Sequence, residues 1–194
     1  MKISNGIILI VFGLLVCFVT NAAPETRPPE SKSKQTILGQ YATAKEAYER
    51  WRANPQGIKV LDVRNLAEYV YVGHAPMAYN IPYKIMSGEW DRESQGYASM
   101  TNPDFVAEVR KKFGAQDTIF IMCRSGGRSA AAVNALAEAG FKSAYTVIDG
   151  FEGDTVEDST SYFHGKRVRN GWKNSGAPWT YDLDPDLVYK KESR

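Results

Sequence analysis

The hydrophobic positions of this 194-residue chain form short continuous runs separated by segments with helical periodicity. A run of about five apolar residues that is bounded by polar or turn-forming residues is typical of a buried strand. Apolar positions three and four residues apart are typical of a helix that covers such strands. The pattern predicts strands at residues 58–63, 78–82, 118–122 and 144–148, and helices at residues 44–52, 103–113 and 129–139.

Local signals indicate where these helices begin and end. Thr43 and Glu46 stand three residues apart in a capping-box pattern, so the first helix should begin there. Asn102 followed by Pro103 is typical of an N-cap with proline at the first helical position. Gly140 follows the Ala-rich helix and is expected to close it. The helix boundaries therefore do not depend on periodicity alone.

Strands that alternate with helices predict an α/β domain, a three-layer fold with a mainly parallel central sheet flanked by helices. In such a sheet, ligands bind beyond the carboxyl ends of the strands, where Asp62, Arg64 and Cys123 are expected to lie. Two long polar segments, residues 83–101 and 153–173, fit no element. Irregular segments of that length in a compact domain are usually functional loops or insertions.

The N-terminal residues carry a different pattern. Lys2 precedes an apolar run at residues 7–19, and small residues follow at a plausible cleavage point, which predicts a secretory signal peptide at residues 1–23. The run is short for a membrane span, so an uncleaved anchor is the less favoured alternative. Lipidation of Cys17 is disfavoured because a valine, rather than a small residue, precedes it. We therefore expect a periplasmic or secreted protein.

Composition places the remainder of the chain among ordinary globular domains. Hydrophobic residues make up 43% of the chain and the net charge is +2, so the sequence does not indicate a nucleic-acid-binding protein. The expected layout is a flexible Pro- and Ser-rich tether at residues 24–35, a domain at residues 36–182 with insertions near 83–101 and 154–170, and a tail at residues 183–194.

Signal cleavage would leave Cys123 as the only thiol, because the sequence has two cysteines in all. A protein with one thiol forms no internal disulfide, and a free thiol in an oxidising compartment is a liability unless it is used. The two histidines and the thiol are widely separated in sequence, so they provide no metal-ligand spacing. No metal or other cofactor is expected.

The stretch CRSGGRS at residues 123–129 lies between the predicted strand at 118–122 and the Ala-rich helix. A glycine-rich loop that leads into a helix points backbone N–H groups inward, and the helix N-terminus adds partial positive charge. These surroundings favour the thiolate, the nucleophilic form of cysteine. The simpler alternative is a buried cysteine beside a glycine turn. The paired glycines, the flanking arginines and the helix start favour the reactive thiol.

Five stretches of the chain resemble the single-domain rhodanese, or sulfurtransferase, family, and together they span residues 36–181. They are LDVR at residues 61–64 followed by Glu68-Tyr69, GHAPMAYNIP at 73–82, the loop at 123–128, VIDGFEG at 147–153, and GWKNSGAPW at 171–179. The chain departs from the family pattern at residues 154–170, which interrupt the run into the Gly-Trp segment. It also departs at residues 86–101, which are enlarged. Either insertion could wall or cap a pocket.

The resemblance implies a two-step sulfur transfer. A thiolate attacks the outer sulfur of a donor such as thiosulfate, becomes a persulfide, and passes the sulfur to a thiol or to cyanide. Cys123 would be the nucleophile, and Asp62 and Arg64 would organise the pocket. A protein acceptor is an open alternative, whereas neither nucleic acid nor stable membrane insertion after signal cleavage is expected. The residues implied in substrate binding, through backbone N–H groups or guanidinium groups, are Arg124, Ser125, Gly126, Gly127, Arg128 and Ser129.

The charged residues also have structural interpretations. Arg124 could be an exposed charge at the pocket rim. Arg128 could instead tie the loop to Asp62 or Glu68, with no contact to a donor. For Arg64, a buried ion pair that holds the loop is favoured over a direct role in the pocket.

The histidines and tryptophans are weaker candidates for the site. His74 lies in a Gly-His-Ala-Pro turn, which favours a hydrogen-bonded structural residue over a catalytic base, and His164 is expected to be exposed. Trp172 and Trp179 are expected to pack at the edge of the domain. Trp90, in the first insertion, is the better candidate for a pocket wall.

Other functions fit the same loop less well. A cysteine phosphatase or arsenate reductase requires five residues between cysteine and arginine, whereas four separate Cys123 from Arg128. Met122 also occupies the position before the cysteine where those phosphatases have histidine. The smaller cradle suits a single sulfur atom. The second alternative is a persulfide carrier without turnover, or a rhodanese-like module that binds a partner or senses redox state.

Overall fold

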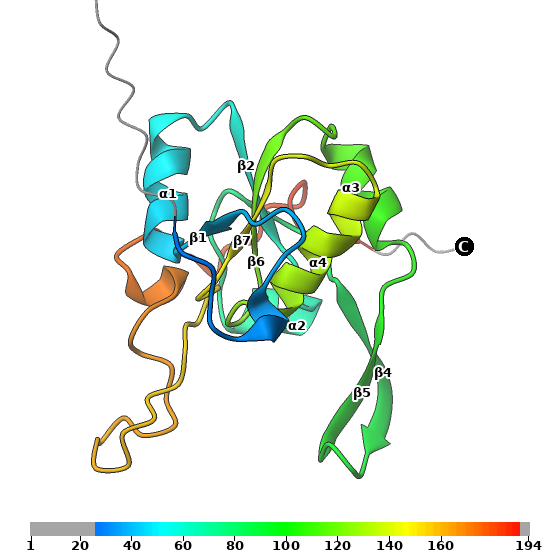
Figure 1. Cartoon of the computed structure of the whole chain (residues 1–194). Helices are drawn as coiled ribbons and strands as arrows, with labels where there is room; N and C mark the ends of the chain where they lie inside the picture. Colours follow the sequence, from blue (N-terminus) through cyan, green and yellow to red (C-terminus); the bar gives the residue numbers. More distant parts are fainter. Residues whose placement is uncertain (1–25, 191–194) are drawn as a thin grey trace, which may run out of the picture.

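The computed structural model describes residues 26–190, so the predicted signal peptide at residues 1–23 lies outside the described part. A five-stranded sheet forms the centre, with its strands in the order β1-β7-β6-β2-β3 and every neighbouring pair parallel (Figure 1). These strands are β1 (Tyr41–Ala42), β2 (Ile58–Asp62), β3 (Ala78–Asn80), β6 (Thr118–Met122) and β7 (Ala144–Val147). The predicted α/β fold with a mainly parallel sheet is confirmed.

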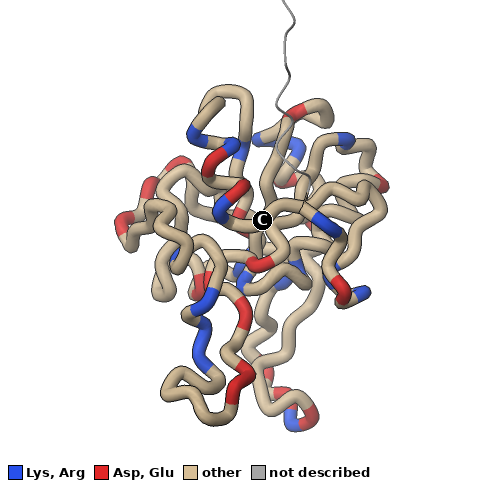
Figure 2. Tube along the Cα trace, turned by 60° about the vertical axis from the view of Figure 1, so that its left-hand side comes forward, with Lys and Arg blue, Asp and Glu red and all other residues tan. Residues whose placement is uncertain are grey.

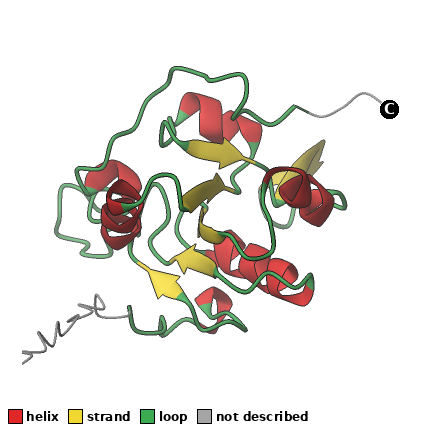
Figure 3. Ribbon diagram, turned by 90° about the horizontal axis from the view of Figure 1, so that it is seen from above, coloured by secondary structure: helices red, strands yellow, loops and turns green. Residues whose placement is uncertain are grey.

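Helices cover both faces of this sheet (Figure 3). They are α1 (Ala44–Ala53), α2 (Leu66–Tyr71), α3 (Phe105–Lys112) and α4 (Gly127–Glu138), together with the short 3-10 helices η1 (Lys32–Lys34) and η2 (Trp172–Asn174). Side chains alternate across a strand, so β6 contributes to two separate cores. Ile119 and Ile121 pack with residues of α3 and α4, whereas Phe120 and Met122 pack with residues of α1 and with Trp172.

Of the two helix starts that the sequence signals predict, one is confirmed, and Gly140, with φ +90°, follows the end of α4 as predicted. The Thr43 hydroxyl accepts the Glu46 N–H at 3.2 Å in the predicted capping box. The predicted N-cap at Asn102 is wrong, because α3 begins at Phe105 and Asp104 is its N-cap. The Asn102 side chain instead donates to the Pro82 carbonyl at 2.9 Å and so joins the two ends of the first insertion. The Ala-rich helix α4 begins two residues earlier than predicted.

The two insertions extend from the same end of the domain, on either side of α2 (Figure 1). Residues 83–101 contain an antiparallel hairpin of β4 (Lys84–Asp91) and β5 (Gly96–Thr101), which the sequence pattern did not predict. Residues 154–170 form an arm held by an isolated bridge between Val156 and His164. The hairpin follows β3 and the arm follows β7. Both therefore flank the carboxyl end of the parallel sheet, where the loop between β6 and α4 also lies.

Residues at both ends of the described chain lie against the domain. The Lys34 ammonium, at the end of the predicted tether, donates to the Ile148 carbonyl at 3.0 Å and pairs with Asp154 at 2.9 Å. In the predicted tail, the Leu187 carbonyl accepts the Asn80 N–H at 2.8 Å. Within residues 26–190 we find no helix with the length and apolar character needed to span a membrane.

Candidate functional site

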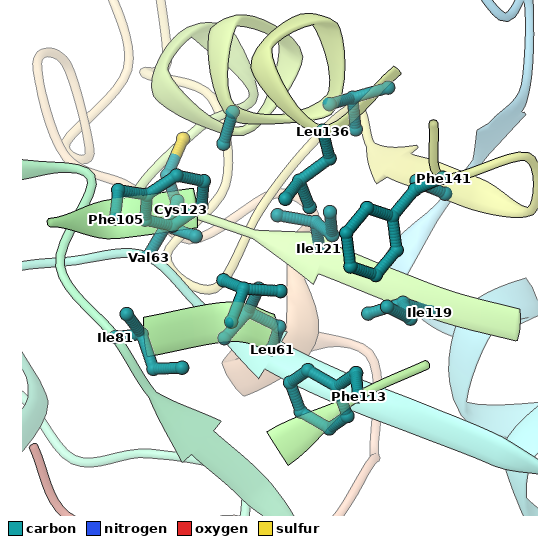
Figure 4. Packing of buried hydrophobic residues seen from close by; sticks show 14 residues of the cluster. Leu61, Val63, Ile81, Phe105, Phe113, Ile119, Ile121, Cys123, Leu136 and Phe141 are labelled. Carbon is teal, nitrogen blue, oxygen red and sulfur yellow. The ribbon is translucent and has the colours of Figure 1, made fainter. Parts of the chain in front are cut away.

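Cys123 directly follows β6 at the carboxyl end of the sheet. Its side chain is 2% exposed and lies beside Val63 and Phe105 beneath α4 (Figure 4). Its Sγ accepts the Gly126 N–H at 3.1 Å. Apolar side chains therefore close the inner side of the thiol, and the loop that follows it supplies the polar surroundings.

Most of the backbone donors in this loop have no acceptor in the described chain. The N–H groups of Arg124 and Ser125, and those of residues 127–129, donate to no protein atom within residues 26–190. Those of residues 127–129 belong to the first turn of α4, where unpaired N–H groups carry the positive end of the helix dipole. The loop thus provides donors for a negative charge next to the thiol.

Two glycines allow the loop to pack against the turn after β7. Gly126 has φ +104°, and a Cβ there would lie 2.3 Å from the Ile148 carbonyl oxygen. Gly150 has φ +63°, and a Cβ there would lie 2.5 Å from the Cys123 carbonyl oxygen. That same carbonyl accepts the Phe151 N–H at 2.7 Å. The backbone on both sides of the thiol is therefore held by residues 148–151. By contrast, a Cβ at position 127 would meet open space.

Arg128 is held by Glu68, as the structural interpretation of that residue proposed. Its two terminal nitrogens donate to the two carboxylate oxygens at 2.6 and 2.5 Å. Burial alone would raise the pKa of Glu68, but the hydrogen bonds and charge of Arg128 outweigh it and hold the pKa below the ordinary 4.5. Burial alone would likewise lower the pKa of Arg128, but the Glu68 carboxylate, with a smaller contribution from Cys123, raises it.

The other polar side chains of the loop differ in exposure. Arg124 is exposed, and its side chain makes no hydrogen bond or ion pair with any residue between 26 and 190. Ser125 is half-buried. Ser129 is fully buried, and its hydroxyl donates to the Gly126 carbonyl and lies 2.9 Å from the Thr146 hydroxyl. The Ser129 hydroxyl is therefore unavailable to a substrate, which limits the predicted binding role of this residue to its backbone N–H.

Asp62 and Arg64 form a fully buried ion pair, the arrangement favoured for Arg64 from the sequence. Arg64 Nε lies 3.0 Å from both carboxylate oxygens, and a terminal nitrogen lies 2.6 Å from Asp62 Oδ2. The guanidinium carbon lies 4.0 Å from the centre of the Phe151 ring. Because the Phe151 N–H binds the Cys123 carbonyl, the ion pair supports the turn that holds the thiol loop. Neither charged group is accessible to a ligand.

His74 has the structural role expected for it. It is buried, its ring nitrogens lie 3.1 Å from the Tyr69 carbonyl and 3.2 Å from the Asp182 carbonyl, and the ring stacks on Tyr69 at 3.9 Å. His164 is exposed on the arm, as expected. Within residues 26–190, no group of three or more His, Cys, Asp or Glu side chains is arranged to hold a metal ion.

The tryptophans agree only in part with their predicted roles. Trp172 is buried, packs edge-on against Tyr48 and donates to the Pro178 carbonyl, as expected for a packing residue. Trp179 is 37% exposed and lies 4.1 Å from the Lys173 ammonium. Trp90 is 59% exposed and packs on its cross-strand neighbour in β5, so it does not wall a pocket around the thiol.

Sequence reasoning did not identify Asp149 as a support of this region. Its carboxylate accepts the Ala44 N–H at 2.7 Å and the Gly171 N–H at 2.8 Å, and so joins the start of α1 to the segment before η2. Burial raises the pKa of Asp149, although these hydrogen bonds oppose the shift. The available signal was a carboxylate directly before the Gly150 turn.

Comparison with known proteins agrees with this arrangement. The profile of the family described as Rhodanese-like domain matches residues 43–155. The chain is 38% identical over 95 residues to "Thiosulfate sulfurtransferase 16, chloroplastic" of Arabidopsis thaliana, a match that covers 49% of this chain and 72% of that protein. It is 28% identical over 136 residues to an uncharacterised protein of Rickettsia conorii, covering 70% and 93% respectively. The crystal structure of Rv0390 from M. tuberculosis superposes with a TM-score of 0.55 and 30% identity, covering 74% of this chain and all of that one.

Proposed function

The chain belongs to the family of rhodanese-like domains, and from this premise we propose that it is a sulfurtransferase that carries sulfur as a persulfide on Cys123. The observation that carries the proposal is the thiol at the head of a loop whose backbone N–H groups, apart from that of Gly126, donate to no acceptor among residues 26–190. The sulfurtransferase named among its relatives supports the reaction class.

In the first step, the Cys123 thiolate attacks the outer sulfur of thiosulfate. A bond forms between the two sulfur atoms, the sulfur–sulfur bond of the donor breaks, and sulfite leaves with the electron pair. The terminal sulfur of the persulfide then carries the negative charge. The N–H groups of the loop and of the first turn of α4 are suited to stabilise that charge, since they are fixed before the reaction begins.

In the second step, a thiolate or cyanide attacks the terminal sulfur and releases the Cys123 thiolate. The low exposure of Cys123 limits this step to nucleophiles that reach the thiol past the outer side of the loop. Arg124 is the loop's exposed guanidinium, so we assign it to binding the donor's oxyanion and the leaving sulfite. Arg128, whose terminal nitrogens are occupied by Glu68, is assigned to holding the loop.

Steady-state turnover of thiosulfate with cyanide tests the proposal. We expect the wild type to form thiocyanate continuously and Cys123→Ser to form none, because serine cannot carry the persulfide. A persulfide carrier, the alternative function, would load sulfur from thiosulfate but release it only to its protein partner, so it would form no thiocyanate with cyanide. Export belongs to the same proposal, and the N-terminal sequence of protein recovered from the periplasm or medium should begin at residue 24.

A further inference from the structure

An apolar groove of about 480 Å³ lies between α2 and β4, outside the candidate site. None of residues 123–129 lines it. Three segments that are distant in sequence converge there, namely α2, the start of the hairpin, and residue 189 near the C-terminus. Its walls include Leu66, Val70, Tyr71, Ile85 and Met86.

The two sides of α2 have different surroundings. On the inner side Tyr69 is fully buried and Glu68 binds Arg128. On the groove side Leu66 is 41% exposed and Tyr71 is 80% exposed. Apolar surface that gathers in a groove, rather than being scattered singly, is typical of a binding site.

Among residues 26–190, Lys84 is the only charged residue that lines the groove, and no acidic side chain of this range lines it. Its ammonium group makes no ion pair with any residue from 26 to 190. The groove volume falls within the range of small-ligand pockets, about 300–1,000 Å³, and its composition matches their usual character of apolar walls with a few polar groups. Lys84 is exposed, so an anionic head group can pair with its ammonium group, whereas a wholly apolar ligand would make no use of that charge.

We propose that this groove binds a free medium-chain carboxylate, with its alkyl chain against α2 and β4 and its head group at Lys84. The proposal does not depend on sulfur transfer, because no residue of the thiol loop contributes to the groove. Decanoate, octanoate and decanol are the probes, and titration calorimetry on the full chain is the measurement.

The chain-length series tests the apolar wall. Each buried methylene should raise affinity about fourfold, so decanoate should bind about fifteenfold more tightly than octanoate. Leu66→Asp should abolish binding, because it places a carboxylate on the wall at a site exposed enough to tolerate it. Ile37→Asp is the matched control, since Ile37 is an exposed aliphatic residue outside the groove, and it should bind like the wild type.

The head group is tested separately. Lys84→Met should weaken decanoate up to about fivefold, as for an exposed ion pair, and leave decanol unchanged. Lys142→Met, at an exposed lysine outside the groove, should have no effect. Equal affinity for octanoate and decanoate, or binding that survives Leu66→Asp, would overturn the proposal. It would also be overturned by binding to phosphatidylglycerol vesicles without binding of free decanoate, or by a Leu66-dependent dimer that excludes decanoate.

Discussion

The two arginines of the CRSGGRS loop lie in different environments, so their substitution should have different effects on donor use and on stability. Arg124 is exposed and has no side-chain partner among residues 26–190, so Arg124→Ala should remove a charge-assisted contact to the donor and leave stability unchanged. Such a contact contributes about 1.5–3 kcal/mol, which corresponds to a fall in kcat/KM for thiosulfate of roughly tenfold or more. Steady-state kinetics and thermal denaturation of the same sample measure both effects. Unchanged kcat/KM would remove Arg124 from donor binding.

Arg128→Ala should instead act first on stability. The substitution leaves the half-buried Glu68 carboxylate without its bidentate partner, at an expected cost of about 1–3 kcal/mol in the free energy of unfolding. Urea denaturation measures that cost. This reverses the expectation from the sequence that Arg128 contacts the donor. A variant with wild-type stability and strongly reduced thiosulfate use would restore that expectation.

Glu68 should make the stability of the protein depend on pH. Its pKa in the folded protein lies below 4.5, so its stabilising contribution is fully present above pH 4.5 and is lost as pH falls through the folded pKa. Wild type should therefore be more stable than Glu68→Gln at neutral pH, and the difference should shrink below pH 4.5. Melting temperatures of both proteins across this range provide the check. A difference that is constant with pH would show that the Glu68 charge is not what stabilises the loop.

For single residues, the sequence predicted the place of Cys123 in the fold better than it predicted the side-chain contacts around it. The position of Cys123 between a buried strand and a helix start depends only on residues adjacent in sequence, so the local sequence pattern predicts it. The partner of Arg128 depends on where α2 lies against α4, sixty residues apart in the chain. Local patterning therefore left two interpretations open. The buried hydroxyl of Ser129 was missed for the same reason, because Thr146 on β7 completes its hydrogen bonds.

Among the elements, the turn between β6 and α4 depends most on one backbone conformation. Gly126→Ala should destabilise the protein and abolish sulfur loading, because the new Cβ would lie 2.3 Å from the Ile148 carbonyl oxygen. Gly140→Ala is the matched control: it also has a positive φ, +90°, but its Cβ would meet nothing within 4 Å. The control should lose about 1–2 kcal/mol from backbone strain alone. Equal losses in both variants, measured by urea denaturation, would contradict the packing between the loop and the turn after β7.

The hairpin should be separable from the domain. Tyr83 and Asn102 are joined by a backbone hydrogen bond of 2.9 Å, so an Asn-Gly turn can replace residues 84–101. We expect the shortened protein to keep its fold and sulfur loading, because the residues of β4 and β5 are mainly exposed. Circular dichroism and the loading assay measure the outcome. Loss of cooperative unfolding would show that the hairpin belongs to the core.

The hairpin and helix α2 were not predicted for the same physical reason, namely that neither shows a clear periodicity of apolar residues. The buried strands were predictable because the interior requires mainly apolar side chains on β2, β6 and β7. The hairpin packs chiefly on itself, so neither strand shows a clear alternation of buried and exposed residues. Helix α2 is only six residues long, too short for periodicity, although its capping box at Asn65 and Glu68 repeats the pattern that did identify α1. The capping box at Asn65 and Glu68 was the sequence signal that predicts α2.

At the scale of the whole molecule, the two insertions extend from one end of the domain. The hairpin and the arm at residues 154–170 stand on either side of the end that carries the thiol loop (Figure 1). Basic and acidic residues lie on opposite sides of the arm (Figure 2). At the base of the arm, Asp154 forms an ion pair with Lys34 and accepts a hydrogen bond from the Asn170 side chain. The lengths of the two insertions were readable from the sequence. Their common direction follows from the parallel topology, which places the carboxyl ends of β3 and β7 at the same end of the sheet.

The central claim is that Cys123 carries the transferred sulfur. Intact-mass measurement after incubation with thiosulfate, without any acceptor, tests it most directly, with Cys123→Ser as the control. We predict that the wild type gains the mass of one sulfur atom, that cyanide then removes it, and that Cys123→Ser gains nothing. A wild type that gains no sulfur, or a serine variant that gains the same mass, would contradict the account.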